Sequence, residues 1–326
     1  MRVRLTQFVI ALVILFSVPV AFAQNQAACR LNSLLVNVLD QHGNPVSDLH
    51  KDYFRVQLNK RPVPISSAEY RVLPRRVVLA LDLSGSMRSD PNKWEIARTS
   101  VQAFLRMMPQ EVRVAFLGFS DRVIVTFEFN RDRSVMLEWL DKINDQKHPL
   151  RGPTALYDGL SAALKMLEPH EEGDAIYVIT DGQDNSSQSV TGEDLNKDLL
   201  KNRVRLFAFL LAEHLPIEGP RKDLEIMSSA NETGGFVFGR AAEKSWFLGA
   251  SFEMNKNVRE IIKAQIALFN VQLNGFYSLN FGSSGEVANG SKVSLDVVDQ
   301  GGKRRKDLVI AFPHRVLGCP LPPAKN

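Results

Sequence analysis

Residues 77–87 read Val-Val-Leu-Ala-Leu-Asp-Leu-Ser-Gly-Ser-Met, and this stretch decides the predicted fold. Its first five residues are apolar without a break, which is typical of a strand buried on both faces, as in a parallel sheet covered by helices. Asp82 ends the run, and the hydroxyl side chains of Ser84 and Ser86 follow at alternate positions. Ligands of open α/β sheets bind beyond the carboxyl ends of the strands, and these oxygens suit a hard cation such as Mg²⁺. On this motif alone, a strand followed by a serine-rich turn is the other interpretation.

The chain after this stretch alternates between amphipathic helical patterns and short apolar runs. We expect helices at 93–108, 132–143, 154–167, 193–201, 223–233 and 255–273. We expect strands at 112–119, 123–129, 175–180, 205–211 and 236–238. The gap between the first two of these strands is so short that they must pair antiparallel. The alternation otherwise predicts an α/β fold with a doubly wound, mostly parallel sheet flanked by helices.

The segments on either side of the α/β region are rich in β-like patterns. Strands are expected at 34–39, 54–58, 276–281, 293–298 and 308–312, whereas 63–72 reads as broken, extended chain. Neither segment is large enough to bury a core by itself. We therefore predict one small β-sandwich built from both ends, with the α/β domain inserted between its halves. The predicted domains are 24–73 and 275–326 for the two halves, the second with the C-terminal tail, and 74–274 for the α/β domain.

The first residues predict export. Arg2 and Arg4 precede the apolar run Phe8–Val18, and Ala21-Phe22-Ala23 forms a small-x-small cleavage site. The alternative is a membrane anchor, but about 11 apolar residues are too few to span a bilayer. We expect residues 1–23 to be a signal peptide cleaved near Ala23, with no membrane span in the mature chain. The mature protein is then periplasmic or extracellular.

Composition and cysteine content narrow the classes of function. Without residues 1–23 the chain has 38 basic and 36 acidic residues, which gives no reason to expect a nucleic-acid partner. The two cysteines, Cys29 and Cys319, stand near the two ends of the mature chain and can form a disulfide after export; two free thiols are the alternative. The sequence contains no serine-hydrolase elbow and no phosphate-binding loop, so we do not expect an enzyme.

Two more oxygen-bearing side chains stand where a strand ends or a helix begins. Thr154 stands at the start of the expected helix 154–167, and Asp181 follows the apolar run 175–180. Since the ends of neighbouring parallel strands meet at one edge of a sheet, both can converge with the Asp82 loop. Three further acids near these positions are expected to border the site, namely Asp121, Asp158 and Asp184, although Asp158 could equally cap a helix or face solvent.

The full set resembles the von Willebrand factor type A domain and its metal-ion-dependent adhesion site, with the pattern Asp-x-Ser-x-Ser…Thr…Asp. All five positions match, over about residues 75–272, and one departure is Pro153, where a second glycine is common. The flanks are similar to those of secreted bacterial proteins of this family, most familiar from Acidobacteria. The flanking residues that carry this likeness are 36–40, 43–46, 52–56 and 277–279.

The resemblance implies a role for each residue of the set. Ser84 and Ser86 would bind a divalent cation directly, with Mg²⁺ expected and Mn²⁺ or Ca²⁺ as alternatives. Thr154 would bind directly or through water, and Asp82 and Asp181 mainly through waters. A partner protein's Asp or Glu would complete the coordination of the ion. The expected function is therefore an exported, cation-dependent adhesion module without enzymatic activity.

Two other functions remain open at this point. The ion can instead stabilise a structural scaffold of an envelope complex, or it can activate water in a Mg²⁺-dependent hydrolase. The sequence does not indicate the identity of the partner or the oligomeric state.

Overall fold

The computed structural model describes residues 33–72, 75–143, 152–211, 223–239, 256–281 and 290–317. Residues 1–23, Cys29 and Cys319 lie outside these ranges, so the signal peptide and the disulfide stay predictions. Within the described ranges, no helix combines the length and the apolar character needed to span a membrane.

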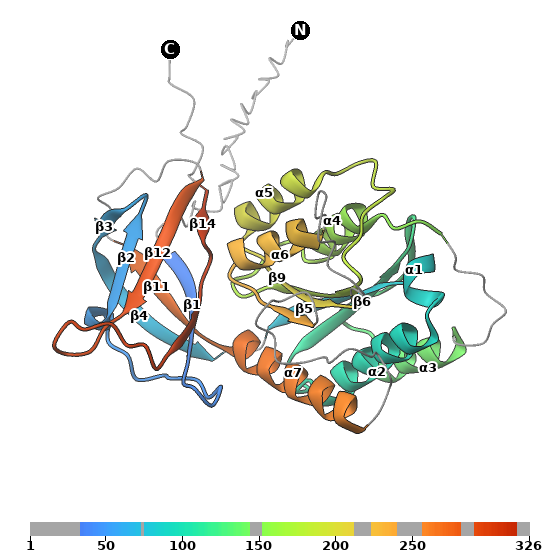
Figure 1. The fold of residues 1–326 in the computed structure, drawn as a ribbon, viewed down its shortest axis with the longest axis horizontal. Helices are drawn as coiled ribbons and strands as arrows, with labels where there is room; N and C mark the ends of the chain where they lie inside the picture. Colours follow the sequence, from blue (N-terminus) through green and yellow to red (C-terminus); the bar gives the residue numbers. More distant parts are fainter. Residues whose placement is uncertain are drawn as a thin grey trace, which may run out of the picture. The chain divides into compact units, whose positions relative to one another are not determined.

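A six-stranded sheet forms the centre of the α/β region, in the order β10-β9-β8-β5-β6-β7 (Figure 1). Its strands are β5 (Arg76–Asp82), β6 (Arg113–Phe119), β7 (Val123–Phe127), β8 (Ala175–Thr180), β9 (Arg205–Leu210) and β10 (Val237–Gly239). β7 pairs antiparallel with β6, and the other neighbours pair parallel. This arrangement confirms the predicted doubly wound, mostly parallel sheet.

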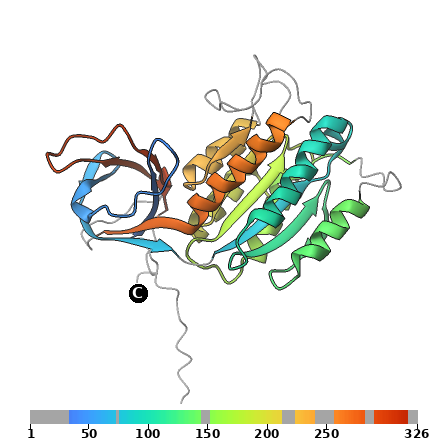
Figure 2. The ribbon, with the colours of Figure 1, turned by 90° about the horizontal axis from the view of Figure 1, so that it is seen from below.

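Helices cover both faces of this sheet (Figure 2), and the inner strands β5, β8 and β9 are buried at every position. The helices are α1 (Gly85–Arg88), α2 (Pro91–Met107), α3 (Arg133–Lys142), α4 (Leu156–Met166), α5 (Gly192–Asn202), α6 (Asp223–Glu232) and α7 (Lys256–Asn274). Alternate residues of β5 point to opposite faces. Val77 and Leu79 pack in the core under α2, α3 and α7. Val78 and Ala80 pack in the core under α4, α5 and α6.

α2 begins two residues earlier than the sequence pattern predicts, because its start is fixed by capping. The Asp90 side chain accepts hydrogen bonds from the N–H groups of Asn92 and Lys93, and Pro91 occupies the first helical position. Both features are favourable at a helix N-terminus.

The C-terminal end of α2 is held by one side chain from α3. The Arg133 guanidinium donates to the carbonyls of Met108, Pro109 and Val112 at 2.5–2.7 Å. We expect Arg133→Ala to destabilise the protein by about 2 kcal/mol, because these carbonyls lose charge-assisted hydrogen bonds. Urea unfolding measures this, with Arg131→Ala as the control, since Arg131 is exposed. Equal losses for the two variants would contradict the role given to Arg133.

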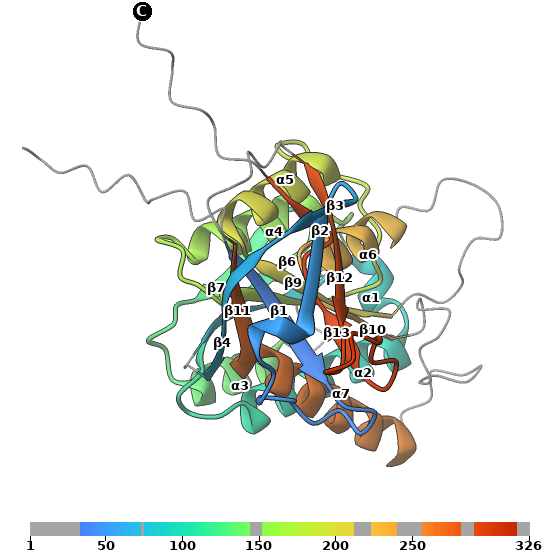
Figure 3. The same cartoon turned by 90° about the vertical axis from the view of Figure 1, so that its left-hand side faces the viewer.

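Two antiparallel four-stranded sheets contain strands from both ends of the described chain, as Figure 3 shows. One has the order β13-β1-β11-β4 and the other β14-β12-β2-β3. Their strands are β1 (Ser33–Leu39), β2 (Phe54–Leu58), β3 (Arg61–Val63), β4 (Ile65–Val72), β11 (Gly275–Phe281), β12 (Ser291–Val297), β13 (Val309–Ala311) and β14 (Arg315–Val316). Leu34, Phe54, Tyr277 and Leu295 share one apolar core. The chain enters and leaves the α/β region through this sandwich, in agreement with the prediction.

The stretch 63–72, expected to be broken, is mostly the regular strand β4, which pairs with β11 over its length. Its side chains are only partly buried, since β4 lies at the edge of its sheet. Its mixed polar sequence therefore lacks the alternation by which a half-buried strand is recognised.

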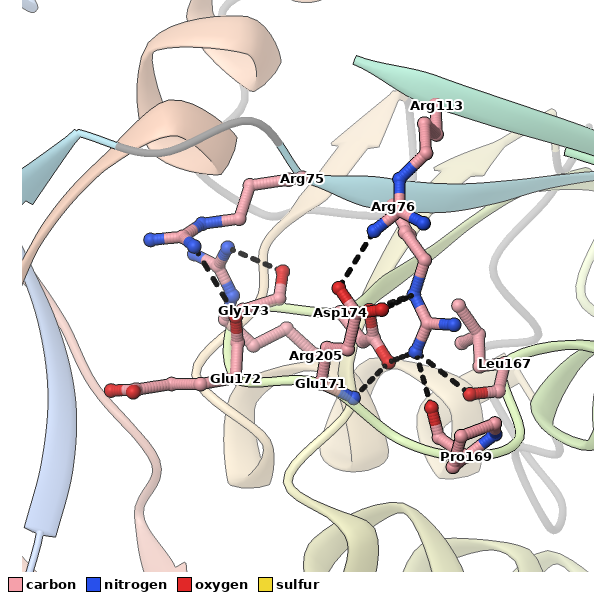
Figure 4. A network of polar contacts seen from close by, with 10 residues as sticks. All are labelled: Arg75, Arg76, Arg113, Leu167, Pro169, Glu171, Glu172, Gly173, Asp174 and Arg205. Carbon is pink, nitrogen blue, oxygen red and sulfur yellow. Dashed lines mark hydrogen bonds and ion pairs between the residues drawn. The ribbon is translucent and has the colours of Figure 1, made fainter. Parts of the chain in front are cut away.

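Polar side chains gather at the amino ends of the parallel strands of the central sheet (Figure 4). Arg76 donates two hydrogen bonds to the Asp174 carboxylate, at 3.0 and 2.6 Å, and both side chains are buried. Arg205 is also buried. It donates to the side-chain oxygen of Asn37 in strand β1 and to the carbonyl of Gln272 in helix α7. Burial lowers the pKa of the Arg205 guanidinium to about 9. The bond between Arg205 and Asn37 joins the α/β region to strand β1 of the sandwich.

Candidate metal centre

Asp82 anchors the candidate site at the carboxyl end of β5. Its carboxylate accepts hydrogen bonds from the Ser84 N–H at 2.9 Å and from the Thr180 hydroxyl at 2.7 Å. The Asp82 side chain is completely buried, and loss of solvation raises its pKa to about 6. Because Thr180 ends β8, these bonds tie the ends of two neighbouring strands together.

The two serine hydroxyls lie side by side above Asp82. Ser84 Oγ and Ser86 Oγ are 3.1 Å apart, on a loop whose Gly85 N–H donates to the Gly152 carbonyl at 2.9 Å. Two neighbouring ligands of an octahedral Mg²⁺ lie about 3 Å apart, because each is about 2.1 Å from the ion. The spacing of the serine hydroxyls therefore fits adjacent positions on such an ion.

Thr154 is held against the loop that follows β8. Its N–H donates to the side-chain oxygen of Asn185 at 2.7 Å, and its carbonyl accepts from the N–H groups of Asn185 and Ser186. The next residue, Ala155, donates to the Ser120 carbonyl at the end of β6. These bonds fix a buried threonine among the loops at the same edge of the sheet as Asp82.

Asp181 lies directly after β8. It forms an ion pair with Lys93, a residue that the sequence pattern does not select. Lys93 Nζ is 3.6 Å from Asp181 Oδ2, and both side chains are buried. Lys93 comes from the first turn of α2, on the same helical face as the buried Ile96 and Ala97. A lysine three and four residues before apolar core positions is the signal that predicts its inward direction.

The neighbouring acids hold loops. The Asp184 carboxylate accepts from the N–H of Leu156, at the start of α4, at 2.8 Å. The Asp158 carboxylate accepts from three consecutive N–H groups, those of residues 188–190, at 2.9–3.1 Å. Asp121 is partly exposed and pairs with Arg122. The sequence leaves open whether Asp158 borders the site, caps a helix or faces solvent, and the structure shows it bound to the backbone of a loop.

The chemistry of the donor set suits a hard cation. The described residues contain no group of three or more His, Cys, Asp or Glu arranged to hold a metal ion. The candidate donors are instead mainly hydroxyls, those of Ser84, Ser86 and Thr154, together with the carboxylates of Asp82 and Asp181. Such oxygen ligands favour Mg²⁺ over the softer metals that thiolates and imidazoles select.

A doubly wound sheet with a hydroxyl- and carboxylate-bearing edge defines the class of this domain. Residues 77–183 match the family model described as von Willebrand factor type A domain. The central region of the chain is therefore a von Willebrand factor type A domain, as the sequence pattern predicts.

Solved structures that are similar to this chain are distant from it in sequence. A von Willebrand factor type A protein from Catenulispora acidiphila is 11% identical, with a TM-score of 0.45, 90% of this chain and 75% of that chain covered. An aerotolerance-related membrane protein from Bacteroides fragilis is 18% identical, with a TM-score of 0.42 and coverages of 59% and 98%. Proximal thread matrix protein 1 from the mussel byssus, with a zinc-occupied MIDAS motif, is 18% identical, with a TM-score of 0.43 and coverages of 66% and 49%. No curated protein matches the chain.

Proposed function

We propose that this chain is an exported protein-binding module that holds a divalent cation and captures an acidic residue of a partner protein through it. The observation that carries the proposal is the 3.1 Å separation of the Ser84 and Ser86 hydroxyls, beside the buried Asp82 carboxylate. The presence of a von Willebrand factor type A domain supports it, since such domains generally mediate protein interactions.

In this proposal each residue of the set has a separate role. Ser84 and Ser86 bind the ion, and Thr154 binds it directly or through water. Asp82 and Asp181 orient hydroxyls and bound waters, because Asp82 already accepts from the Ser84 N–H and the Thr180 hydroxyl. The ion, Mg²⁺ in our proposal, keeps net positive charge and exchangeable waters with mostly neutral ligands, so it can accept a carboxylate from outside.

Export and family relation are part of the same proposal. The basic start, the apolar run and the small-x-small site of residues 1–23 support a cleaved signal peptide. The flanking motifs at 36–40 and 43–46 support a relation to the secreted bacterial proteins with this domain. We also propose that the chain is not an enzyme, since no general base stands at a convincing spacing from the candidate site.

Capture of partners from the producing organism's envelope fraction tests this function. The immobilised full chain is incubated with and without Mg²⁺, beside Ser86→Ala and its matched control Ser89→Ala. Ser86 contributes a hydroxyl to the site, whereas Ser89 is exposed and follows α1. We expect Mg²⁺-dependent, EDTA-reversible capture by the wild type and Ser89→Ala, and its loss in Ser86→Ala.

The same experiment separates the two other functions. Capture that survives EDTA and is unchanged in Ser86→Ala would contradict the proposal and favour a structural scaffold. Mg²⁺-dependent turnover of a phosphoester panel by the wild type, absent in Ser86→Ala, would favour a hydrolase.

A further inference from the structure

Lys93 brings a positive charge into the buried edge of the sheet. Its side chain is 6% exposed, and Nζ lies 3.6 Å from Asp181 Oδ2, whose own side chain is 3% exposed. Lysine is seldom buried unless it is paired, because removing an ammonium group from water is costly. Its position in the candidate site therefore needs a reason beyond packing.

The local structure of α2 does not provide that reason. Lys93 lies in the first turn of the helix, and its own N–H donates to the capping carboxylate of Asp90 at 3.2 Å. Unpaired N–H groups give a helix N-terminus a partial positive charge, which disfavours a cation in the first turn. The ammonium is favoured instead by its ion pair with Asp181, a member of the proposed ion site.

The negative charge of Asp181 would consequently be shared between the Lys93 ammonium and the proposed divalent cation. Asp181 also lies close enough to Asp82 for its negative charge to act on the Asp82 carboxylate and raise the pKa of that group. A divalent cation at the serine hydroxyls would draw on both carboxylates. Lys93 already neutralises part of that charge, and its ammonium repels a second cation in a setting that screens charges less than water does.

We propose that Lys93 is an internal competitor of the divalent cation, a fixed positive charge that keeps the ion affinity of the site low. The inference rests on the proposed function. Its consequence is a coupling between ion and partner. Lys93 neutralises part of the negative charge of the site, and a carboxylate from a partner replaces that charge. The ion and the partner therefore bind more tightly together than separately. Such coupling is reciprocal.

The opposite role for Lys93 has the opposite signature. If the ammonium served only to orient the Asp181 carboxylate toward the ion, removing it would weaken ion binding. The direction of the change in affinity therefore distinguishes competition from positioning.

Calorimetric titration of the metal-stripped full chain with Mg²⁺ tests the inference. We compare the wild type with Lys93→Met, and with Lys142→Met as a matched control that removes the same charge from a surface pair with Glu138. Lys93→Gln serves as a second neutral variant that keeps a polar end. We expect the Lys93 variants to bind Mg²⁺ tighter by about tenfold, because one like charge is removed from a poorly screened site, and Lys142→Met to match the wild type.

Two results would overturn the competitor role of Lys93, and they differ in whether the ion site remains. Unchanged or weaker Mg²⁺ binding in folded Lys93→Met and Lys93→Gln, with saturable binding in the wild type, would overturn the competitor role and leave the proposed ion site standing. Saturable binding in none of the proteins would overturn the ion site itself, and the competitor role with it.

Discussion

Asp82→Ala is expected to abolish the stabilisation that Mg²⁺ gives to the folded protein. An ion that binds only the native state stabilises it by about 2.7 kcal/mol at a concentration one hundred times its dissociation constant. The variant removes the carboxylate that accepts from the Ser84 N–H and the Thr180 hydroxyl, so the serine loop loses its anchor. Scanning calorimetry with and without Mg²⁺ measures the ion-dependent gain for each variant separately from its metal-free stability.

The matched control for Asp82→Ala is Asp121→Ala. Asp121 lies near the same edge of the sheet, but it is 40% exposed and pairs with Arg122. We expect this variant to keep the full Mg²⁺-dependent gain. Ser86→Ala, a milder change at a partly buried hydroxyl, should also lose the gain and covers the case in which Asp82→Ala does not fold. An unchanged gain in folded Asp82→Ala would show that the ion binds elsewhere.

Asp174→Asn is expected to cost about 3–5 kcal/mol of folding stability, the largest loss that we predict for one substitution. Asp174 makes two charge-assisted hydrogen bonds to Arg76, and both side chains are almost fully buried. Asparagine keeps the shape but removes the charge, which leaves the buried Arg76 guanidinium with two carbonyl acceptors and a longer contact, at 3.5 Å, to the half-exposed Glu171. Urea unfolding provides the measurement.

Glu171→Gln is the control for this loss. Glu171 lies three residues from Asp174 and pairs with Arg113 and, at the longer distance of 3.5 Å, with Arg76, but its own side chain is about half exposed. Exposed pairs contribute about 0–1 kcal/mol, so this variant should unfold close to the wild type. A loss for Asp174→Asn no larger than that for Glu171→Gln would contradict the importance of the buried pair.

The central domain could be predicted because its inner strands consist mainly of unbroken apolar runs. Every residue of β8 and β9 is buried, and such runs between amphipathic helices are typical of covered parallel strands. β4 was misread because only one side of this edge strand contributes to a core, and its polar residues hide the period.

In the candidate site, the residues that stand close together in the sequence could be predicted, whereas those that depend on distant contacts could not. Asp82, Ser84 and Ser86 stand within one loop, so their spacing is visible in the sequence. Thr180 and Asn185 were missed because their roles depend on contacts with residues about 30 to 100 positions away. Lys93 was missed for the same reason: its helical position predicts that it points inward, but only the fold brings Asp181 to it.

Anomalous diffraction from a crystal of the full chain soaked in Mn²⁺ tests the central claim most directly. Mn²⁺ accepts the same oxygen ligands as Mg²⁺ and can be located by its anomalous signal. Our account predicts a peak at coordination distance from both the Ser84 and Ser86 hydroxyls, with Thr154 and Asp181 around it. A peak away from these hydroxyls, or none at millimolar Mn²⁺, would contradict the account.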